Sequence, residues 1–171
     1  MTITLRPATQ ADVPLLELWD EDPDVHASSP NDDWDWAGQT LATEGLNNFI
    51  AELDGRPIGY IQLTDLARDA SQYWGAHQTG LMAIDIEIGE PDARGAGNGR
   101  IIMGLALEFC FSDPSIRAVL IDPLITNTRA ISFYQSLGFI FLENRWFDQD
   151  HCAVHHMTRE TYNKEHPHDR P

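Results

Sequence analysis

The sequence predicts an α/β domain of the mixed α+β kind, with a mostly antiparallel central sheet of about six to seven strands and about four flanking helices. Short segments of alternating polar and apolar residues are joined by turn signals such as Asp54-Gly55, which is typical of antiparallel hairpins. Longer apolar runs show helical spacing. A strand, a glycine-rich turn and a helix also follow one another between residues 81 and 111.

The N-terminal third of the sequence is predicted to form one strand followed by two helices. Residues 2–6 alternate between polar and apolar side chains, as a strand does. Thr9, followed three residues later by Asp12, resembles a capping box and predicts the start of a helix. Residues 20–36 contain many helix breakers and predict a loop with short turns, and a second helix is expected at 37–47.

The remainder of the chain predicts alternating strands, loops and helices. Polar residues 65–79 are expected to form a hairpin loop, and Asn127 is predicted to cap a helix that Gly138 ends. We expect one domain, residues 1–160, followed by a polar and frayed tail, residues 161–171. The expected strands are 48–52, 57–63, 81–88, 117–121, 139–143 and 152–158, and the expected helices are 101–111 and 128–136.

The composition limits the classes of function. The 171 residues carry a formal net charge of −16, so nucleic-acid binding is not expected, because phosphates would be repelled. No apolar run reaches the roughly 20 residues of a membrane span, and the N-terminus does not resemble a signal peptide. We therefore expect a cytoplasmic protein without membrane association, either a monomer or a homodimer. Cys110 lies in an apolar helical run and is predicted to fill the core.

Acidic residues are concentrated in the N-terminal part of the chain, and no Lys or Arg occurs between Arg6 and Arg56. One interpretation is a solvated face that keeps the protein soluble. The other is a surface that concentrates a cationic substrate, since a cleft lined by one sign of charge attracts the opposite sign. The acidic residues are Glu17, Asp20, Glu21, Asp22, Asp24, Asp32, Asp33 and Asp35.

The glycine-rich turn, Arg94–Arg100, predicts a phosphate site. Between a strand and a helix, such a turn presents unpaired backbone N–H groups at the positive end of the helix dipole. Gly95, Gly97 and Gly99 do not have the GxGxxG spacing of a dinucleotide-binding turn. No Gly-Lys-Ser/Thr sequence follows the turn, which excludes a nucleoside triphosphate P-loop.

Two segments together resemble the GNAT superfamily of acetyl-CoA-dependent N-acyltransferases. Arg94–Gly99 matches the Arg/Gln-x-x-Gly-x-Gly/Ala pattern of that family, and Asn127–Phe139 is similar to its Asn-x-x-Ala-x-x-x-Tyr-x-x-x-Gly-Phe segment. The resemblance covers residues 56–158. It implies a GNAT fold, with a central sheet splayed at the coenzyme A site, and acetyl-CoA as co-substrate. The donor-binding residues it implies are Ile86, Ile88, Arg94, Gly95, Ala96, Gly97, Gly99, Arg100, Asn127 and Ala130.

Within the superfamily, the chain looks most like the aminoglycoside 6'-N-acetyltransferases. The likeness is carried by residues 59–62, 83–85, 108–114 and 121–123. It implies that Asp85 and Asp122 are acids on the acceptor side, and Asp69 is the nearest counterpart of a further acid in the loop after residue 62. Siderophore-type acyltransferases, an alternative branch, typically carry a His on the central strand, where this chain has Asp85 and Glu87.

The carboxylates provide the chemistry that an amine acceptor needs. Asp85 and Glu87 alternate in phase on one strand, and Asp122 follows the next strand, so the three are expected to face one cleft. Carboxylates that share a site raise one another's pKa, which suits a base that works near neutrality. Alternatively, Asp122 caps the Asp-Pro turn and Asp85 is a structural partner of a Tyr or Arg. The family resemblance implies that Tyr134 is the general acid; the alternative is that it only packs.

The acceptor is expected to be a small cationic amine, most favourably a polycationic aminoglycoside. The expected acceptor-binding residues, besides the catalytic acids, are Trp34, Trp36, Asp69, Tyr73, Trp74 and Glu87. Polyamines and lysine-like amines fit the same features, and a binding module that holds acyl-CoA without catalysis is the alternative from another class. His26, His77, His151, His155 and His156 lack the spacing of a structural zinc site around Cys152, so no metal is expected.

Overall fold

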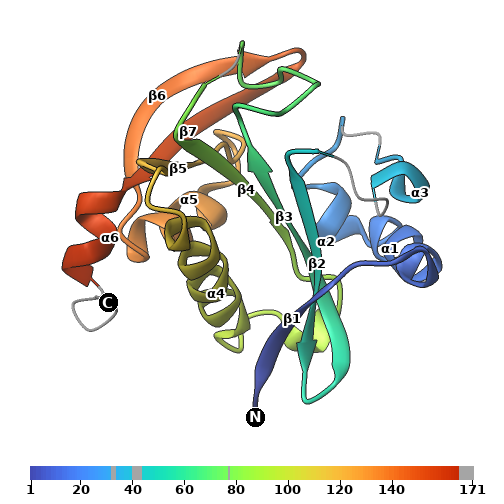
Figure 1. Cartoon of the computed structure of the whole chain (residues 1–171). Helices are drawn as coiled ribbons and strands as arrows, with labels where there is room; N and C mark the ends of the chain where they lie inside the picture. The colour runs from blue at the N-terminus through green and yellow to red at the C-terminus, as the bar shows by residue number, and fades with distance from the viewer. Residues whose placement is uncertain (32–33, 40–43, 77, 166–171) are drawn as a thin grey trace.

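The computed structural model describes residues 1–31, 34–39, 44–76 and 78–165. Its centre is one seven-stranded sheet in the order β1-β2-β3-β4-β5-β7-β6, as Figure 1 shows. Neighbouring strands are antiparallel except for β4 and β5, which are parallel. This confirms the predicted mixed sheet. The strands are β1 Ile3–Pro7, β2 Leu46–Leu53, β3 Arg56–Asp65, β4 Leu81–Glu87, β5 Ala118–Ile121, β6 Ile140–Phe147 and β7 Asp150–Thr158.

Six α-helices lie within the described part of the chain, and only three of them are longer than seven residues. None of the described helices is long and apolar enough to cross a membrane. The helices are α1 Val13–Asp20, α2 Pro23–His26, α3 Trp36–Gln39, α4 Asn98–Ser112, α5 Thr128–Ser136 and α6 Arg159–Glu165, with 3-10 turns at Gln10–Asp12 and Pro91–Ala93.

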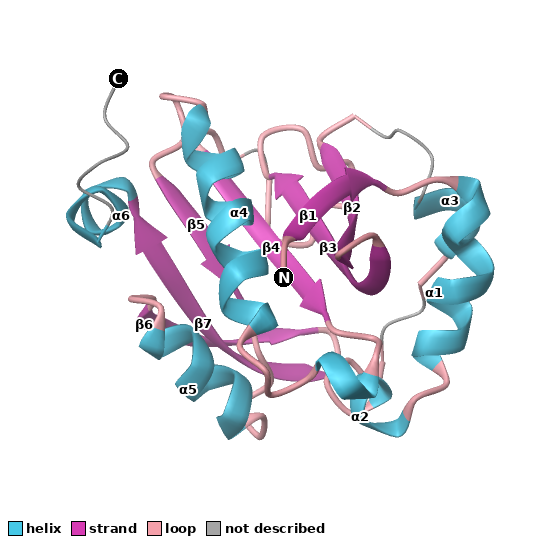
Figure 2. Ribbon diagram, turned by 90° about the horizontal axis from the view of Figure 1, so that it is seen from below, coloured by secondary structure: helices cyan, strands magenta, loops and turns pink. Residues whose placement is uncertain are grey.

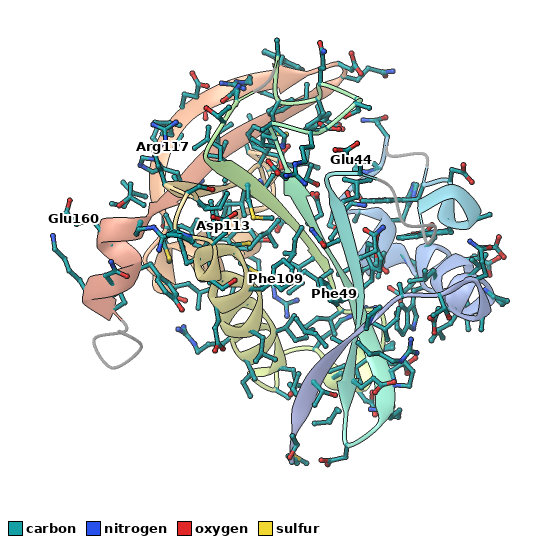
Figure 3. All side chains as sticks on the ribbon, viewed as in Figure 1. Glu44, Phe49, Phe109, Asp113, Arg117 and Glu160 are labelled. Atoms are coloured by element: carbon teal, nitrogen blue, oxygen red, sulfur yellow. The ribbon has the colours of Figure 1, made fainter. Side chains whose placement is uncertain are left out.

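Helices cover both faces of the sheet. α4 packs along one face, where Ile102, Met103 and Ala106 join strand residues in the main core (Figure 2). Phe109 of α4 also meets Phe49 of β2, with ring centroids 5.5 Å apart (Figure 3). On the other face, α1 and α3 close a second core at the β1–β3 end. Because side chains alternate along β4, Ile84 and Ile86 point to α4 whereas Asp85 and Glu87 point to the opposite face.

The predicted capping signal at Thr9 is confirmed. The Asp12 carboxylate accepts hydrogen bonds from the Thr9 backbone N–H at 2.8 Å and from the Thr9 hydroxyl at 3.0 Å. It also pairs with Arg6, and that hydrogen bond lowers the pKa of Asp12 to about 2. The cap thereby joins the end of β1 to the start of α1.

Two predicted elements need correction. The helix expected at 37–47 is only the single turn α3, and residues 40–43 lie outside the described part of the chain. Leu46 and Asn47 belong to β2 instead, because they pair with Thr64 and Leu63 of β3. The expected frayed tail is wrong for residues 161–165, which form part of α6, where Tyr162 stacks on Phe111 with ring centroids 4.6 Å apart. Residues 166–171 lie outside the description.

The sheet opens between its two parallel strands. β4 and β5 pair only at Leu81–Ala83 with Ala118–Leu120, after which β4 continues to Glu87 without this neighbour. The strands therefore separate, as the resemblance implied. The backbone groups of β4 beyond Ala83 face this gap on one edge, and the candidate site lies there.

Candidate functional site

Two cavities meet at the gap between β4 and β5. One is lined by the Arg94–Arg100 turn and by residues of α5 that include Phe133 and Tyr134, and we call it the loop cavity. The other is lined by Asp85, Glu87, Asp122 and Asp150, and we call it the acidic cavity. They share Ser28, Ile86, Glu87, Asn127, Ala130 and Tyr134. A ligand in one cavity therefore reaches a ligand in the other directly.

The loop cavity contains nine of the ten predicted donor-binding residues; Ala96 is not part of its lining. Gly97 has a φ of 85° and is the N-cap of α4, a left-handed conformation that glycine adopts without steric cost. Asn98, at the first helical position, donates its buried side-chain amide to the Ala93 carbonyl at 2.9 Å. The turn thus aims the N-terminus of a 15-residue helix at the cavity, which is an anion-binding arrangement.

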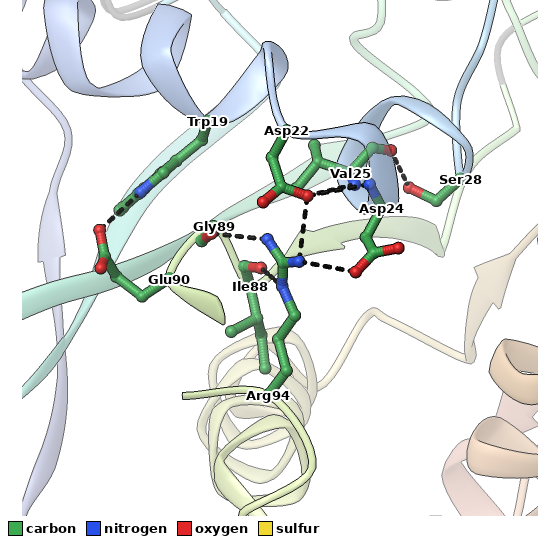
Figure 4. A network of polar contacts seen from close by, with 9 residues as sticks. All are labelled: Trp19, Asp22, Asp24, Val25, Ser28, Ile88, Gly89, Glu90 and Arg94. Atoms are coloured by element: carbon green, nitrogen blue, oxygen red, sulfur yellow. Dashed lines mark hydrogen bonds and ion pairs between the residues drawn. The ribbon is translucent and has the colours of Figure 1, made fainter. Parts of the chain in front are cut away.

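Arg94 has a different contact from the predicted phosphate pairing. Its Nε donates to the Ile88 carbonyl at 2.8 Å, and a terminal nitrogen donates to the Gly89 carbonyl at 2.6 Å (Figure 4). The other terminal nitrogen donates to Asp22 at 3.0 Å and to Asp24 at 3.2 Å. Four of the five N–H groups of a guanidinium are thereby engaged. Arg94 ties the end of β4 to α2, so the backbone of the turn is what faces a phosphate.

Arg100 and Asn127 also hold the loop cavity together. The Arg100 guanidinium reaches Ser136 at the end of α5, with one nitrogen 2.8 Å from the hydroxyl oxygen. The Asn127 side chain caps α5 by accepting a hydrogen bond from the Ala130 N–H at 3.0 Å, which bears out its expected role at the helix N-terminus. The three arginines of this lining, Arg94, Arg100 and Arg129, are the only basic side chains in it.

The acidic cavity brings together all three predicted catalytic residues. Asp85 comes from β4, Asp122 follows β5, and Tyr134 comes from α5. Glu87, Trp34 and Tyr73 line the same cavity. Among the described residues, its lining contains four carboxylic acids and no Lys, Arg or His. A cationic ligand is therefore favoured there, since nearby carboxylates attract it and no positive charge opposes it.

Tyr134 carries its proton throughout the neutral range. Burial raises the pKa of the Tyr134 phenol well above its usual value, and the charges of Asp85 and Asp122 raise it further. Both carboxylates therefore lie close enough to act on this phenol. Tyr134 is thus a protonated phenol at the wall that the two cavities share.

Tyr73 closes the acidic cavity from the loop between β3 and β4. Its hydroxyl donates to Asp122 at 2.7 Å, and its ring stacks on Phe147 with centroids 4.4 Å apart. Burial and then the Asp122 charge raise the pKa of Tyr73 above its usual range. The phenol therefore stays protonated and acts as a hydrogen-bond donor to Asp122.

Glu87 is a buried carboxyl on the shared wall. Burial raises the pKa of Glu87 to about 8; the negative charges of Asp20 and Asp22 raise it as well, whereas Arg94 lowers it. Its Oε1 atom is buried and has no hydrogen-bond partner among the described residues. At neutral pH this carboxyl is mostly protonated, unlike an exposed glutamate.

Three residues that were predicted to bind the acceptor do not line the acidic cavity. Trp36 is 3% exposed, donates to Asp20 and stacks beneath Trp34 at 4.9 Å between ring centroids. Trp74 is 6% exposed and packs against Phe147. The carboxylate of Asp69 accepts hydrogen bonds from the Ser71 backbone and hydroxyl, so it holds the loop turn. None of the three belongs to the lining of the acidic cavity.

The acids of the N-terminal stretch also have mostly structural partners. Asp20 accepts from Trp36, while Asp22 and Asp24 pair with Arg94. Asp32 and Asp33 lie outside the described residues. The four described acids of the acidic cavity come from β4, β7 and the segment after β5, and none of the described N-terminal acids belongs to its lining, contrary to expectation.

Sequence reasoning missed several lining residues. Tyr60 faces the acidic cavity because it lies directly opposite Glu87 across β3 and β4, and period-two alternation from Asp85 is the signal that finds it. Asp150 is the first residue of β7, and Ser28 and Ser29 come from the loop after α2. No local pattern marks these three, because only the strand order brings them to the gap.

The histidines and cysteines show no grouping typical of a metal site. Within the described ranges, no three His, Cys, Asp or Glu side chains gather as possible ligands, and His77 lies outside those ranges. His155 is buried, with Nδ1 2.8 Å from the Ala153 carbonyl. Cys110 is buried in the main core, as predicted, and burial raises its pKa to about 12.

Comparison with known proteins agrees with this geometry. The family model described as an acetyltransferase (GNAT) domain matches residues 8–147. An aminoglycoside N(6')-acetyltransferase type 1 of Klebsiella pneumoniae is 28% identical over 156 residues, covering 81% of this chain and 74% of the relative.

Solved structures share the fold. A crystal structure of the aminoglycoside acetyltransferase AAC(6')-Ib with coenzyme A and kanamycin has a TM-score of 0.85 and 26% identity, covering 96% of this chain and 99% of the other. A spermidine N-acetyltransferase chimera from Vibrio cholerae and hSSAT has a TM-score of 0.74 at 16% identity, covering 95% and 98%. The chain therefore belongs to the GNAT acetyltransferase family and is an acetyl-CoA-dependent N-acetyltransferase.

Proposed function

We propose that the protein transfers the acetyl group of acetyl-CoA to a primary amine of a small polycationic acceptor, most specifically the 6'-amine of an aminoglycoside. The observation that carries this proposal is the acidic cavity, whose described lining has four carboxylic acids and no basic side chain and shares Tyr134 with the loop cavity. The Klebsiella relative is named for this activity, and the AAC(6')-Ib structure holds kanamycin.

The loop cavity fits coenzyme A. Its turn presents the N-terminus of α4 to the pyrophosphate, and Arg100 and Arg129 contribute positive charge. The unpaired edge of β4 beyond Ala83 offers backbone N–H groups to the pantetheine arm and to the carbonyl oxygen of the thioester. Acetyl-CoA, when bound, supplies the activated acyl group.

The residues of the acidic cavity can perform the proton transfers. Asp85 and Asp122 would hold the acceptor's ammonium group and take a proton from it, which frees the nitrogen lone pair. The nitrogen–carbon bond forms as the carbon–sulfur bond breaks. Tyr134 would give its proton to the departing sulfur and regain one from the acceptor side, so the proton count balances. Its raised pKa keeps that proton available at neutral pH.

A polyamine acceptor is the second candidate. A linear chain of ammonium groups also suits four carboxylic acids in one cavity, and the spermidine N-acetyltransferase chimera shares the fold. Kanamycin and spermidine differ in shape and in hydroxyl groups, so their rates of acetylation separate the two candidates.

The test is a panel of acceptors with acetyl-CoA at low and high ionic strength. Kanamycin, ribostamycin, spermidine and an N-blocked lysine are compared by release of coenzyme A. We expect turnover with the aminoglycosides and a several-fold rise of their KM with salt, because screening at about 0.15 M acts over about 8 Å. Coenzyme A binding without acetylation of any acceptor would instead identify a binding module, and a KM indifferent to salt would contradict electrostatic capture.

A further inference from the structure

Two buried polar atoms in the described part of the chain lack a hydrogen-bond partner, and both belong to the acidic cavity. They are the indole nitrogen of Trp34 and the Oε1 atom of Glu87. A buried polar group without a partner loses its hydration and receives nothing in return, so native proteins contain few of them. Their coincidence in one cavity indicates that a ligand completes them.

The indole N–H groups of the two neighbouring tryptophans have hydrogen-bond acceptors, whereas that of Trp34 has none among the described residues. Trp19 donates to Glu90 at 2.9 Å, and Trp36 donates to Asp20. Each of these tryptophans therefore has a carboxylate partner from the protein. Trp34 stacks on Trp36 but turns its own N–H to a place without a protein acceptor.

Tyr60 is a neighbour of both residues that carry the unpartnered atoms. Glu87 lies directly opposite Tyr60 across β3 and β4, and the Trp34 ring meets the Tyr60 ring edge-on at 6.1 Å. The Tyr60 hydroxyl serves neither of them, because it donates to Asn48 at 2.8 Å and accepts from Gln62 at 3.2 Å. The pair thus flanks one tyrosine whose own polar group is already occupied.

Their position differs from that of the proposed catalytic acids. Asp85 and Asp122 both act on the pKa of Tyr134, whereas the charged groups acting on Glu87 are Asp20 and Asp22 from the α1–α2 side and Arg94. The proposed function places the reacting amine beside Asp85, Asp122 and Tyr134. Burial raises the pKa of Tyr60, and the charges of Asp85 and Glu87 raise it as well, so Glu87 and Trp34 mark a second position that adjoins Asp85 on the side of α1 and α2.

We propose that Glu87 and Trp34 form a subsite for an amino alcohol unit of the acceptor, in which the Glu87 carboxylate binds an ammonium group other than the acetylated one and the Trp34 N–H donates to a neighbouring hydroxyl oxygen. The proposal rests on the proposed function and narrows its acceptor class. An indole N–H is only a donor and an ionised carboxylate only an acceptor, so one ligand must present both an acceptor and a cation. Aminoglycosides carry amine and hydroxyl groups on adjacent carbons, and spermidine has no hydroxyl.

Glu87 ionises when that ammonium group arrives. A nearby positive charge lowers a carboxyl pKa, so acceptor binding at neutral pH releases the proton that the empty site holds. Calorimetry in two buffers of different ionisation enthalpy measures this release. The wild type is expected to release more protons on binding kanamycin than Glu87→Gln does.

The test compares kanamycin and spermidine binding to the full chain saturated with coenzyme A, by titration calorimetry. Glu87→Gln is expected to weaken both ligands about tenfold or more, since it removes a charge-assisted bond. Trp34→Phe keeps an aromatic ring, although a smaller one, and removes the N–H, so it is expected to weaken kanamycin about two- to tenfold and leave spermidine unchanged. Glu108→Gln on the exposed face of α4 and Trp146→Phe on β6 are the matched controls.

The outcomes separate this inference from the proposed function. Unchanged kanamycin affinity in both variants, with acetylation intact, overturns the subsite alone. A large loss of kcat in Glu87→Gln at unchanged affinity also overturns it, because Glu87 would then act on the reacting proton. If wild-type protein neither binds nor acetylates kanamycin, the subsite and the proposed acceptor both fail. The unfolding temperature of each acceptor-free variant shows whether it folds.

Discussion

The two cavities of this protein are built in different ways. Most of the loop cavity comes from two continuous segments, the Arg94–Arg100 turn and the start of α5. The acidic cavity draws its acids from β4, from the segment after β5 and from the start of β7, and its aromatic side chains from β3, α5 and two loops. Local sequence patterns therefore identify the first cavity, while only the strand order assembles the second.

The difference extends to the means of binding. The loop cavity relies on backbone N–H groups at a helix N-terminus, with its arginines partly occupied by protein contacts. The acidic cavity relies on ionisable side chains whose protonation depends on their neighbours. Side-chain substitutions are therefore expected to affect the acceptor far more than coenzyme A, and the following variants test that contrast.

The largest expected effect is that of Tyr134→Phe, because Tyr134 belongs to both cavities. Removing the hydroxyl keeps the ring packing but removes the proton donor, so kcat is expected to fall about 100-fold or more with little change in either KM. Steady-state kinetics with acetyl-CoA and kanamycin measure this. Tyr162→Phe, which alters a phenol packed on Phe111 away from both cavities, is the control. An unchanged kcat would remove Tyr134 from the chemistry.

Asp122→Asn is expected to act on the acceptor side alone. The amide keeps the size and can still accept the Tyr73 hydrogen bond, but it neither attracts an ammonium group nor takes its proton. We expect kcat/KM for kanamycin to fall about 10- to 100-fold, with the KM for acetyl-CoA within about twofold. Asp148→Asn, in the left-handed turn between β6 and β7, is the control. A loss confined to acetyl-CoA would reverse the assignment of the cavities.

Arg94→Ala is expected to lower the stability of the protein and to weaken binding in both cavities. It removes the bonds to Ile88, Gly89 and α2, and we expect the free energy of unfolding to fall by about 1–3 kcal/mol. Val25 of α2 and Ser28, which follows α2, line the loop cavity and would move when Arg94 no longer holds α2. Both ligands should therefore bind more weakly. Urea unfolding is the measurement. Arg100→Ala, whose contacts are exposed, should change stability by less than about 1 kcal/mol.

The smallest expected effect is a pH dependence of stability caused by Glu87. Its pKa is higher in the folded protein, at about 8, than in the unfolded chain, so the folded state binds more protons. The stabilisation that the raised pKa of Glu87 gives the folded state is complete below the unfolded pKa near 4.5 and is lost as the pH rises through 8. Between pH 7 and 9 the wild type should lose about 1 kcal/mol more than Glu87→Gln. Parallel pH profiles of the two proteins would contradict the raised pKa.

The fold could be predicted well because its signals are local. Alternation, the Asp54-Gly55 turn and the Asn127 cap all act within a few residues, and the structure bears them out. The prediction of a helix at 37–47 was wrong because Leu46 and Asn47 pair with β3, which is distant from them in sequence.

The candidate site shows the same division. Asp85, Glu87, Asp122 and Tyr134 lie together because strand period and a family motif place them. Trp36, Asp69 and Trp74 were misplaced because they lie near loops, where the sequence does not reveal which face of a side chain meets the core. The ion pairs of Arg94 with Asp22 and Asp24 could not be foreseen, since these two partners lie 72 and 70 residues away in sequence.

The central claim is that the loop cavity and the acidic cavity form one site for acetyl transfer to a polycationic amine. The most direct measurement is the identification of the product formed from acetyl-CoA and kanamycin, by mass spectrometry and two-dimensional NMR. We predict a single added acetyl group on the 6'-amine. Recovery of unmodified kanamycin, although coenzyme A binds the protein, would contradict the claim.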